Sequence, residues 1–540
     1  MKRIFNMCRT YFNKYRFMLI MYLLIIIVSG ICTFILPIIS SGFIDYLSNS
    51  KDVRLLIKYC ICFTGVSTIG IVIGYIANRV YIKLIGLITY ELNKDIITYV
   101  QKIRLAYFSD KDIAKLTQQI TTDSQTIISF CFDFIQNIIL NMFKLIIPIF
   151  VIYLINVSLV PIFIILIMMY SVCYYLFKER LFKMTYETKE KQNQYFGRLY
   201  EQLNKIRYIK IHGIFDWFTK RVRPVFDDML NSTLKLQKVQ YLYTGLDNTI
   251  MTVGQIFLFL IGGSMVLKEE ISLGEFTLVS SYFSFGISSL RYFFNLGKQI
   301  QEAKVSCKRL SDIWEEPIEL DEGENLQTVE TIEIENLNFT YNKNNLFKNF
   351  SYTFRKGNSY AILGPNGSGK STLMYLLMGL YDCKYGCIKY NNISLQELNC
   401  IHLRQKLIGV VEQEPDFIND TIYNNLCLYN QYAQSYKIDA IMKEWNLKGV
   451  VEFPKIDLNL IINEKNSNLS GGEKQKLAVI RSCLKNPEVI FWDEPTASMD
   501  FESTKKVLEF IEQEKSKKIV IIITHDITVA EKCDYQIKIK

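Results

Sequence analysis

The sequence predicts an all-α transmembrane domain followed by an α/β domain, and the uneven distribution of apolar residues is the first reason. Of the 540 residues, 50% are hydrophobic, and the mean hydropathy of +0.13 is high for a wholly soluble protein. Long runs of Ile, Leu, Phe and Tyr fill roughly the first 300 positions. The remainder alternates polar and apolar residues, which is typical of a soluble α/β domain. The two halves are therefore expected to fold in different environments.

Six segments are apolar and long enough to cross a bilayer, which takes about 20 residues in a helix. They lie at approximately 18–39, 55–77, 134–155, 157–177, 246–267 and 274–295. The stretch from Met1 to Phe17 is basic and aromatic, so the positive-inside rule places it on the cytosolic side. An even number of crossings returns the second domain to the cytosol. The sequence thus predicts a multi-pass protein of the plasma membrane with about six transmembrane helices and a cytosolic α/β domain.

The gaps after the second and fourth segments are also informative. They are roughly 55 and 70 residues long, with helical periodicity and mixed charge. At 1.5 Å rise per residue, about 20 extra residues carry a helix some 30 Å beyond the membrane. The turns near Ala106 to Lys111 and near Ile209 to Phe215 are then expected to touch the cytosolic domain.

A polar, acidic stretch separates the two domains. Its sequence, EPIELDEGENLQT, contains Pro317 and Gly323, which are typical of a linker. The predicted organisation is a membrane domain at 1–315, a linker at 316–328 and a second domain at 329–540.

Charge and cysteine usage exclude several classes of protein. The net charge is +9, but Lys and Arg are scattered among apolar segments rather than gathered in a basic patch. Anionic lipid head groups explain this pattern better than nucleic acid does. Several of the 13 cysteines lie inside apolar spans and none forms a C-x-x-C pair, which argues against a disulfide framework. The three histidines are not grouped with cysteines at zinc-ligand spacing.

The stretch GPNGSGKST fits the phosphate-loop pattern G-x-x-x-x-G-K-[ST]. Ile362 and Leu363 before it are expected to end a strand, and the residues after it to begin a helix, as the motif requires. Backbone N–H groups would surround the phosphates, Lys370 would reach the β and γ oxygens, and the Ser371 hydroxyl would bind Mg²⁺. The predicted binding residues are Gly364, Pro365, Asn366, Gly367, Ser368, Gly369, Lys370, Ser371 and Thr372. The second domain is therefore expected to be an α/β P-loop NTPase that uses ATP and Mg²⁺.

Two adjacent acids follow the apolar run VIFW. Asp493 is expected to hold Mg²⁺ through water, and Glu494 to act as the general base in hydrolysis. Adjacent acids can also mark a solvated turn, but here they come after a buried strand and before Pro495. This favours the catalytic interpretation.

A third motif, LSGGEKQK, follows GPNGSGKST and precedes VIFWDE. With these motifs the chain resembles an ABC transporter of the exporter type, in which one membrane domain is fused to one ABC ATPase domain. The resemblance covers almost the entire chain. In the membrane half, LAYFSDKDIAKLTQQITTDSQTI resembles the family's first coupling region, and YEQLNKIRYIKIHGIFDWFTKR the region leading to the second. The resemblance implies a half-transporter that works as a dimer, with about twelve helices around the pathway and two ATP molecules between the chains.

The resemblance also implies roles for single residues. Gln413 would meet Mg²⁺ and the attacking water, and His525 would contact the γ-phosphate, so both join Glu494 as catalytic residues. Tyr341 would stack on adenine, although it can also be a surface tyrosine at a strand edge. Asp500 ends a D-loop-like ASMD.

LSGGEKQK is expected to open a helix whose N-terminus, formed by Ser470, Gly471 and Gly472, attracts a γ-phosphate. In the family this motif completes the site of the partner subunit. Glu464 matches an acidic residue that family exporters have before the motif. The chain departs from the family pattern in two places. Glu473, counted here with the nucleotide-binding residues, replaces a frequent glutamine, and Asp526 replaces a frequent arginine.

Polar residues recur at helical spacing in the membrane half, which suggests a face toward a cavity or toward a neighbouring helix. In the sixth span they are Thr277, Ser281, Ser284, Ser288, Arg291 and Asn295, and in the third span Asp133, Asn137, Asn141 and Lys144. Close helix packing by small hydroxyl residues is the alternative interpretation. If Lys144 and Arg291 both face the pathway, a dimer offers four positive charges to an amphipathic cargo with an anionic group.

The sequence therefore predicts ATP-driven export of an amphipathic peptide, lipid or drug-like molecule. An importer with the same fold and a membrane-bound ATP sensor or immunity protein are the alternatives. The intact ATP-site motifs favour a homodimer over a mixed dimer.

Overall fold

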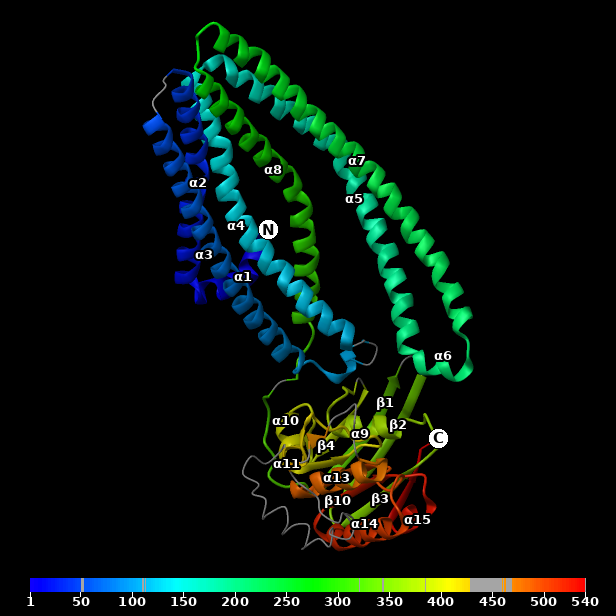
Figure 1. Ribbon diagram of the computed structural model, residues 1–540. Coiled ribbons are helices and arrows are strands. Elements are labelled where there is room, and N and C mark those ends of the chain that lie inside the picture. The colour runs from blue at the N-terminus through cyan, green and yellow to red at the C-terminus, as the bar shows by residue number, and fades with distance from the viewer. Residues whose placement is uncertain are drawn as a thin grey trace. The chain divides into compact units, whose positions relative to one another are not determined.

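The computed structural model describes residues 1–49, 53–108, 111, 113–319, 321–341, 344–383, 385–427, 459, 461–462 and 469–539. The chain divides into two compact units (Figure 1). The first combines Met1–Thr98 with Ala114–Glu315, and the second combines Tyr99–Ile113 with Glu316–Lys540. The sequence places the stretch 99–113 inside the membrane domain. In the structure this stretch clusters with the second unit, because its backbone bonds to residues 316–319.

The first unit is built of long helices. Its helices are α1 (Lys2–Lys14), α2 (Arg16–Asn49), α3 (Val53–Val100), α4 (Ile113–Ile155), α5 (Val160–Asn204), α6 (Ile206–His212), α7 (Phe215–Leu267) and α8 (Leu273–Trp314). The helices α3, α4, α5 and α7 are 48, 43, 45 and 53 residues long. A bilayer takes about 20 residues of helix, so these four extend well beyond one, as the long gaps between apolar segments predict.

Five helices among the described residues have the length and hydropathy needed to cross a membrane. They are Arg16–Ser48, Val53–Val100, Leu116–Ile155, Val157–Asn204 and Phe215–Leu267. The segment 274–295 is helical as part of α8, but it does not belong to this group. The hydroxyl groups of its polar stripe lower its hydropathy. The sixth span therefore stays a prediction.

The helices α5 and α7 lie side by side along their length (Figure 1). Part of α8 also contacts both of them. Two glycines allow this close approach. A Cβ built on Gly254 of α7 would lie 2.8 Å from Leu166 of α5, and one built on Gly286 of α8 would lie 2.4 Å from Phe163. Phe163 also packs edge to face on Phe283, with 5.0 Å between ring centroids. In a membrane the hydrophobic effect does not drive helices together, so close packing at small residues stabilises these contacts instead.

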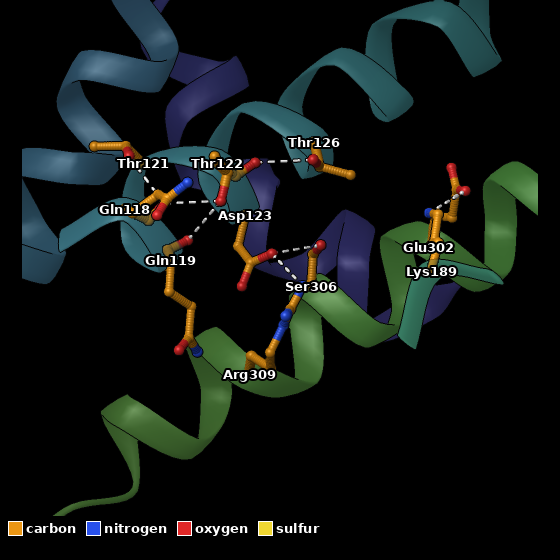
Figure 2. A network of polar contacts seen from close by, with 10 residues as sticks. All are labelled: Gln118, Gln119, Thr121, Thr122, Asp123, Thr126, Lys189, Glu302, Ser306 and Arg309. Atoms are coloured by element: carbon orange, nitrogen blue, oxygen red, sulfur yellow. Dashed lines mark hydrogen bonds and ion pairs between the residues drawn. The ribbon is translucent and has the colours of Figure 1, made fainter. Parts of the chain in front are cut away.

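A polar network joins α4 to α8 (Figure 2). The carboxylate of Asp123 points at α8 and accepts hydrogen bonds from Ser306 Oγ at 2.8 Å and from Arg309 Nη2 at 2.7 Å. A more exposed ion pair, Lys189 with Glu302 at 3.2 Å, links α5 to α8.

The second unit contains a five-stranded parallel sheet. Its strands, in spatial order, are β11 (Tyr535–Lys538), β3 (Asn358–Leu363), β10 (Ile519–Ile523), β9 (Val489–Asp493) and β6 (Ile408–Val411). Every residue of β9 and β10 is buried, which explains their continuous apolar sequences VIFW and IVIII. The carboxyl ends of all five strands meet at one edge, where ligands bind in sheets of this kind.

The described part of this unit also contains helices and a second sheet. The helices are α9 (Lys370–Leu377), α10 (Cys400–His402), α11 (Ile422–Cys427), α13 (Gly471–Leu484), α14 (Phe501–Glu514) and α15 (Ile527–Glu531). An antiparallel sheet has the order β2 (Asn344–Arg355), β1 (Thr331–Tyr341), β4 (Tyr385–Tyr390) and β5 (Ile393–Ser394), and the short strands β7 (Asp420–Thr421) and β8 (Ile461–Ile462) pair separately.

The turn between α3 and α4 is bound to the start of the second unit by its backbone. Ile103 forms an antiparallel bridge with Ile318, and the N–H of Glu319 donates to Lys102 O at 2.7 Å. Arg104 also forms an ion pair with Asp382. These contacts come from residues just before the predicted turn at 106–111. For the turn at 209–215, contact with the cytosolic domain stays a prediction.

Candidate functional site

A cavity of about 610 Å³ lies at the carboxyl edge of the parallel sheet. It is lined by Leu346, Asn366, Gly367, Gly369, Lys370, Ser371, Thr372, Gln413, Asp493, Glu494 and His525. Because β3, β6, β9 and β10 are parallel, the loops that follow them converge here. All of these residues except Leu346 were singled out from the sequence. Leu346 lies in β2 and gave no signal beyond its apolar character.

The loop between β3 and α9 has a backbone that only glycine adopts readily. Gly367 and Gly369 have φ of +82° and +96°, in the left-handed region. A Cβ on Gly364 would lie 2.5 Å from the carbonyl oxygen of Ile539. These three glycines let the chain turn tightly between the strand and the helix, as a phosphate loop must. The hydroxyl of Ser368 is buried without a hydrogen-bond partner among the described residues.

Lys370 begins α9 and is only 7% exposed. Its ammonium donates to the carbonyl oxygens of Gly364 at 2.9 Å and Pro365 at 3.0 Å, which hold it over the loop. The loop therefore carries a fixed positive charge beside its glycines. This charge suits phosphate oxygens.

Ser371 and Asp493 bring two oxygen ligands together. Ser371 Oγ donates to Asp493 Oδ2 at 2.5 Å. Burial raises the pKa of the Asp493 carboxyl, and the hydrogen bond from Ser371 partly offsets this. Gln413 contributes an amide to the same cavity. Hydroxyl, carboxylate and amide oxygens are the donors that Mg²⁺ prefers, so this set of residues fits the expected metal.

Glu494 follows β9 in an unusual backbone conformation, with φ of +47°. Its N–H donates to Ile523 O at 2.8 Å, which anchors it to the end of β10. Its Oε1 lies 3.3 Å from His525 Nε2, and its Oε2 accepts from Gln413 Nε2 at 3.4 Å. A non-glycine residue in this region of φ is uncommon, and such strain is often found at active sites. The structure thus places the expected general base between the other two expected catalytic side chains.

Gln475, which the sequence interpretation missed, connects three parts of the site. It is 1% exposed, and its Nε2 donates to Glu494 O at 2.9 Å and to Gln413 O at 3.4 Å. Its Oε1 accepts from Ser498 N at 3.0 Å. The available signal was its position inside LSGGEKQK, one helical turn from Gly471.

The residues of the LSGGEKQK motif do not line this cavity in the part of the chain that the structure describes. Ser470 caps α13, and Ser470 and Glu473 form a reciprocal capping box, which explains the glutamate as a helix-capping residue. A Cβ on Gly472 would lie 2.5 Å from Ser498 O, so α13 starts in close contact with the ASMD segment.

Asp500 and Asp526 also serve as helix caps. Asp500 accepts from Ser503 N at 2.8 Å and from Lys476 Nζ at 2.9 Å. These hydrogen bonds hold the pKa of the Asp500 carboxyl well below its usual range. Asp526 accepts from Thr528 N at 2.8 Å at the start of α15, which explains an acid after His525.

Two residues are expected near the site, but the structure does not describe their side chains. Tyr341 is the last residue of β1, but its side chain lies outside what the structure describes. Glu464 lies outside the described residues. Adenine stacking by Tyr341 stays a prediction.

Comparison with known sequences decides the family. The family described as ABC transporter matches residues 347–497, and the family described as ABC transporter transmembrane region matches residues 19–290. The chain belongs to the ABC transporter family. The predicted fold class is therefore confirmed, and the second unit is the ATPase domain of this transporter, in which ATP hydrolysis is coupled to transport.

The transporter is similar to several curated proteins. It is 29% identical over 340 residues to the lactococcin-G-processing and transport ATP-binding protein of Lactococcus lactis subsp. lactis, a match that covers 62% of this chain and 48% of that protein, about half its length. It is 26% identical to a putative export ATP-binding/permease protein of Rickettsia typhi, covering 91% of this chain and 85% of that one. It is 24% identical to the ATP-dependent lipid A-core flippase of Syntrophus aciditrophicus, covering 82% and 74%.

A solved structure of a bacterial Atm1-family ABC exporter with ATP bound shares the transporter's fold. The two superpose with a TM-score of 0.85, covering 97% of this chain and 94% of that one, at 19% sequence identity.

The structure shows the polar contacts made by the stripe of α8. Arg291, counted in the sequence hypothesis among the positive charges offered to the cargo, forms an ion pair with Asp247 Oδ2 of α7 at 2.7 Å. The hydroxyl of Ser284 donates to Ser280 O at 3.2 Å, and that of Ser288 to Phe285 O at 2.7 Å, within their own helix. The side chain of Asn295 lies outside what the structure describes. The ion pair with Asp247 offsets the charge of Arg291, and a role of Arg291 and Lys144 in binding cargo stays a prediction.

Proposed function

We propose that this transporter exports an amphipathic peptide, lipid or drug-like molecule across the plasma membrane, by alternating access in a dimer. One observation carries the catalytic part of the proposal. The carboxylate of Glu494 lies between His525 and Gln413 at the edge of the phosphate-loop cavity. A sensor that only binds ATP has no need of this arrangement.

The residues of the cavity divide the work of hydrolysis among them. Lys370 and the backbone N–H groups of the glycine loop hold the phosphates of ATP. Ser371, Asp493 and Gln413 would hold Mg²⁺, which neutralises charge on the phosphates when bound. Glu494 accepts the proton of the attacking water. His525 contacts the γ-phosphate, and its Nε2 lies 3.3 Å from the Glu494 carboxylate, which it also helps to orient.

A dimer is proposed because the LSGGEKQK motif does not line its own chain's cavity as described. Ser470, Gly471 and Gly472 lie at the N-terminus of α13, where free N–H groups and the helix dipole favour an anion. A second copy of the chain can bring this terminus to the γ-phosphate. A homodimer is favoured because the chain contains each expected motif, and a mixed dimer is the alternative.

The choice of export and of an amphipathic cargo rests on the relatives. Their names describe the processing and transport of lactococcin-G, the flipping of lipid A-core, and export. A multi-pass bundle of long apolar helices is consistent with cargo of this kind. Export by this chain is therefore the direction we propose, with import as the alternative.

The first test is ATP hydrolysis by the chain purified alone in lipid nanodiscs. Glu494→Gln removes the proton acceptor and is expected to lower kcat by at least a hundredfold while ATP still binds. Glu502→Gln, on the exposed side of α14, is the matched control and is expected to behave as wild type. Hydrolysis that survives Glu494→Gln would contradict the assignment of the base.

Direction is tested separately with inside-out membrane vesicles. ATP added outside such vesicles is expected to drive accumulation of an amphipathic fluorescent cargo in the wild type and not in Glu494→Gln. ATP-dependent loss of preloaded cargo would show import. The hydrolysis assay also tests the type of dimer. If the chain hydrolyses ATP vigorously only after it is mixed with a second half-transporter, the active form is a mixed dimer and not a homodimer.

A further inference from the structure

A second cavity, of about 350 Å³, lies within the first unit between α2, α3 and α4. One face of each helix lines it. The lining contains two charged side chains, Asp133 and Lys144, together with a mixture of polar, small and apolar ones. This is the size of a small-molecule site, and it lies in helices long and apolar enough to cross a membrane.

Lys144 of α4 lies at one end of this cavity. No carboxylate lies within ion-pair distance of its ammonium in the part of the chain that the structure describes. A lysine at membrane depth is costly unless it meets an anion or water, and it marks a functional site by default. This end of the cavity therefore suits an anionic group.

Asp133 marks the other end, eleven residues earlier on the same helix. At 1.5 Å per residue, the two positions are about 16 Å apart along the axis. Asp133 Oδ1 accepts from the hydroxyl of Tyr81 of α3 at 2.8 Å, and the hydroxyl of Tyr22 of α2 donates to Gln136. The two tyrosines fix the side chains at this end, where the carboxylate can receive a cationic N–H donor.

The middle of the cavity combines apolar side chains with the polar side chains of Ser29 and Asn78, and it has free space. Ile26, Ala77 and Leu140 line it, together with Gly74. A Cβ built on Gly74 would meet no atom within 4 Å. The cavity thus accommodates side chains between its two charged ends.

We propose that this cavity binds a short linear peptide of four or five residues, with its C-terminal carboxylate at Lys144 and its N-terminal ammonium at Asp133. An extended peptide spans at most about 3.3–3.6 Å per residue, so this length matches the separation of the charges. The proposal rests on the proposed function, because it names the class of cargo and where it is held. Binding is tested without ATP, so that the two can fail separately.

The test is equilibrium binding of tetraleucine to the transporter in nanodiscs without nucleotide. In the wild type, amidation of the peptide's C-terminus is expected to weaken binding at least tenfold. Lys144→Met is expected to weaken binding of the free peptide by a similar factor. It is expected to leave binding of the amide unchanged. Lys144→Arg keeps the positive charge, so the free peptide should still bind more tightly than the amide. If the two losses multiply independently, the carboxylate does not meet Lys144 and the proposal is overturned.

The opposite end is tested with N-acetylated tetraleucine and with Asp133→Asn. Each change alone is expected to weaken binding, and acetylation is expected to weaken binding no further in Asp133→Asn. Laurate, a single-chain anion without an ammonium group, is the comparison ligand. Laurate binding as tight as that of tetraleucine, and unaffected by Asp133→Asn, would replace the peptide by an anionic lipid and overturn the proposal.

The location is tested by filling the cavity. Gly74→Phe places a ring into free space and is expected to abolish binding of tetraleucine. Gly65→Phe on the same helix also meets no atom within 4 Å, but Gly65 does not line the cavity, so binding should persist. Equal binding by both variants would place the peptide elsewhere.

The binding and transport results are independent of each other. If the peptide binds as predicted but never accumulates with ATP, the proposal of export is contradicted and the proposed binding site still stands. If the transporter accumulates another cargo but does not bind tetraleucine, the proposed binding site is contradicted and the proposal of export still stands.

Discussion

Arg291 of α8 and Asp247 of α7 form an ion pair, with 2.7 Å between Arg291 Nη2 and Asp247 Oδ2. Asp247 is 8% exposed, and its second oxygen, Oδ1, has no hydrogen-bond partner among the described residues. Arg291 also donates to Asn248 Oδ1 at 3.2 Å. A charge at this depth is costly when alone, so the pair fixes α7 against α8.

Removing one member of this pair is expected to destabilise the protein. Arg291→Met leaves the Asp247 carboxylate buried and unpaired, at a cost of about 1–3 kcal/mol, because the arginine is partly exposed. The double variant Arg291→Gln with Asp247→Asn removes both charges and should recover most of the loss. The midpoint of thermal unfolding in nanodiscs measures both effects.

Arg180→Met is the control for this prediction, because Arg180 is exposed on α5 and its loss should not change the unfolding temperature. If Arg291→Met unfolds like the wild type but no longer shows cargo-stimulated hydrolysis, Arg291 faces the pathway, as the sequence hypothesis held.

The link between α4 and α8 offers a comparison between two polar contacts (Figure 2). The side chain of Asp123 is 3% exposed and accepts from both Ser306 and Arg309, whereas Lys189 and Glu302 are 61% and 43% exposed. Asp123→Ala should lower stability by about 1–3 kcal/mol, because it leaves Ser306 and Arg309 without this acceptor. Glu302→Ala should cost less than about 1 kcal/mol. Equal shifts in unfolding temperature would show that burial does not decide these contacts.

The ATP site could be predicted because its residues lie in local motifs. Lys370 follows a strand and a glycine loop, and Asp493 and Glu494 end an apolar strand. In a parallel sheet, strand ends meet at one edge, so local signals also predict which residues converge. Gln413 and His525 both line the cavity at this edge.

Contacts between distant helices could not be predicted in the same way. The spacing of polar residues showed which face of α8 carries Arg291, but not that Asp247 of α7 lies opposite. Likewise, nothing local indicates that Gln475 reaches Glu494, because that contact depends on how α13 packs beside β9. A single sequence specifies the faces of its helices better than the pairing between them.

Gln475 is expected to act as a positioning residue for hydrolysis. Gln475→Ala frees the carbonyl of Glu494 and the N–H of Ser498, and it should lower kcat about tenfold, which is about 1.4 kcal/mol. The KM for ATP should stay close to wild type, because Gln475 does not line the cavity as described. Steady-state kinetics in nanodiscs separate the two parameters.

Gln475→Glu provides a finer test of the same residue. It keeps an acceptor for the Ser498 N–H but loses the donor to the carbonyl oxygens of Glu494 and Gln413, so a low kcat in this variant assigns the effect to these two contacts and not to Ser498. Wild-type kcat in both variants would contradict the positioning role.

Lys485, just after α13, is expected to make stability depend on pH. Its ammonium donates to Ile408 O at 2.6 Å and to Arg404 O, and burial, with Lys406 and Arg404 nearby, lowers its pKa from 10.5 to about 8. Below pH 8 both the folded and the unfolded chain are protonated there, and the cost of burying the charge is fully present. Between about pH 8 and 10.5 the unfolded chain binds more protons, so the free energy of unfolding rises, by at most about 3 kcal/mol from this group. The unfolding temperature of the wild type should therefore rise relative to that of Lys485→Met over this range. A constant difference between the two proteins from pH 7.5 to 10.5 would show that Lys485 keeps an ordinary pKa in the folded state.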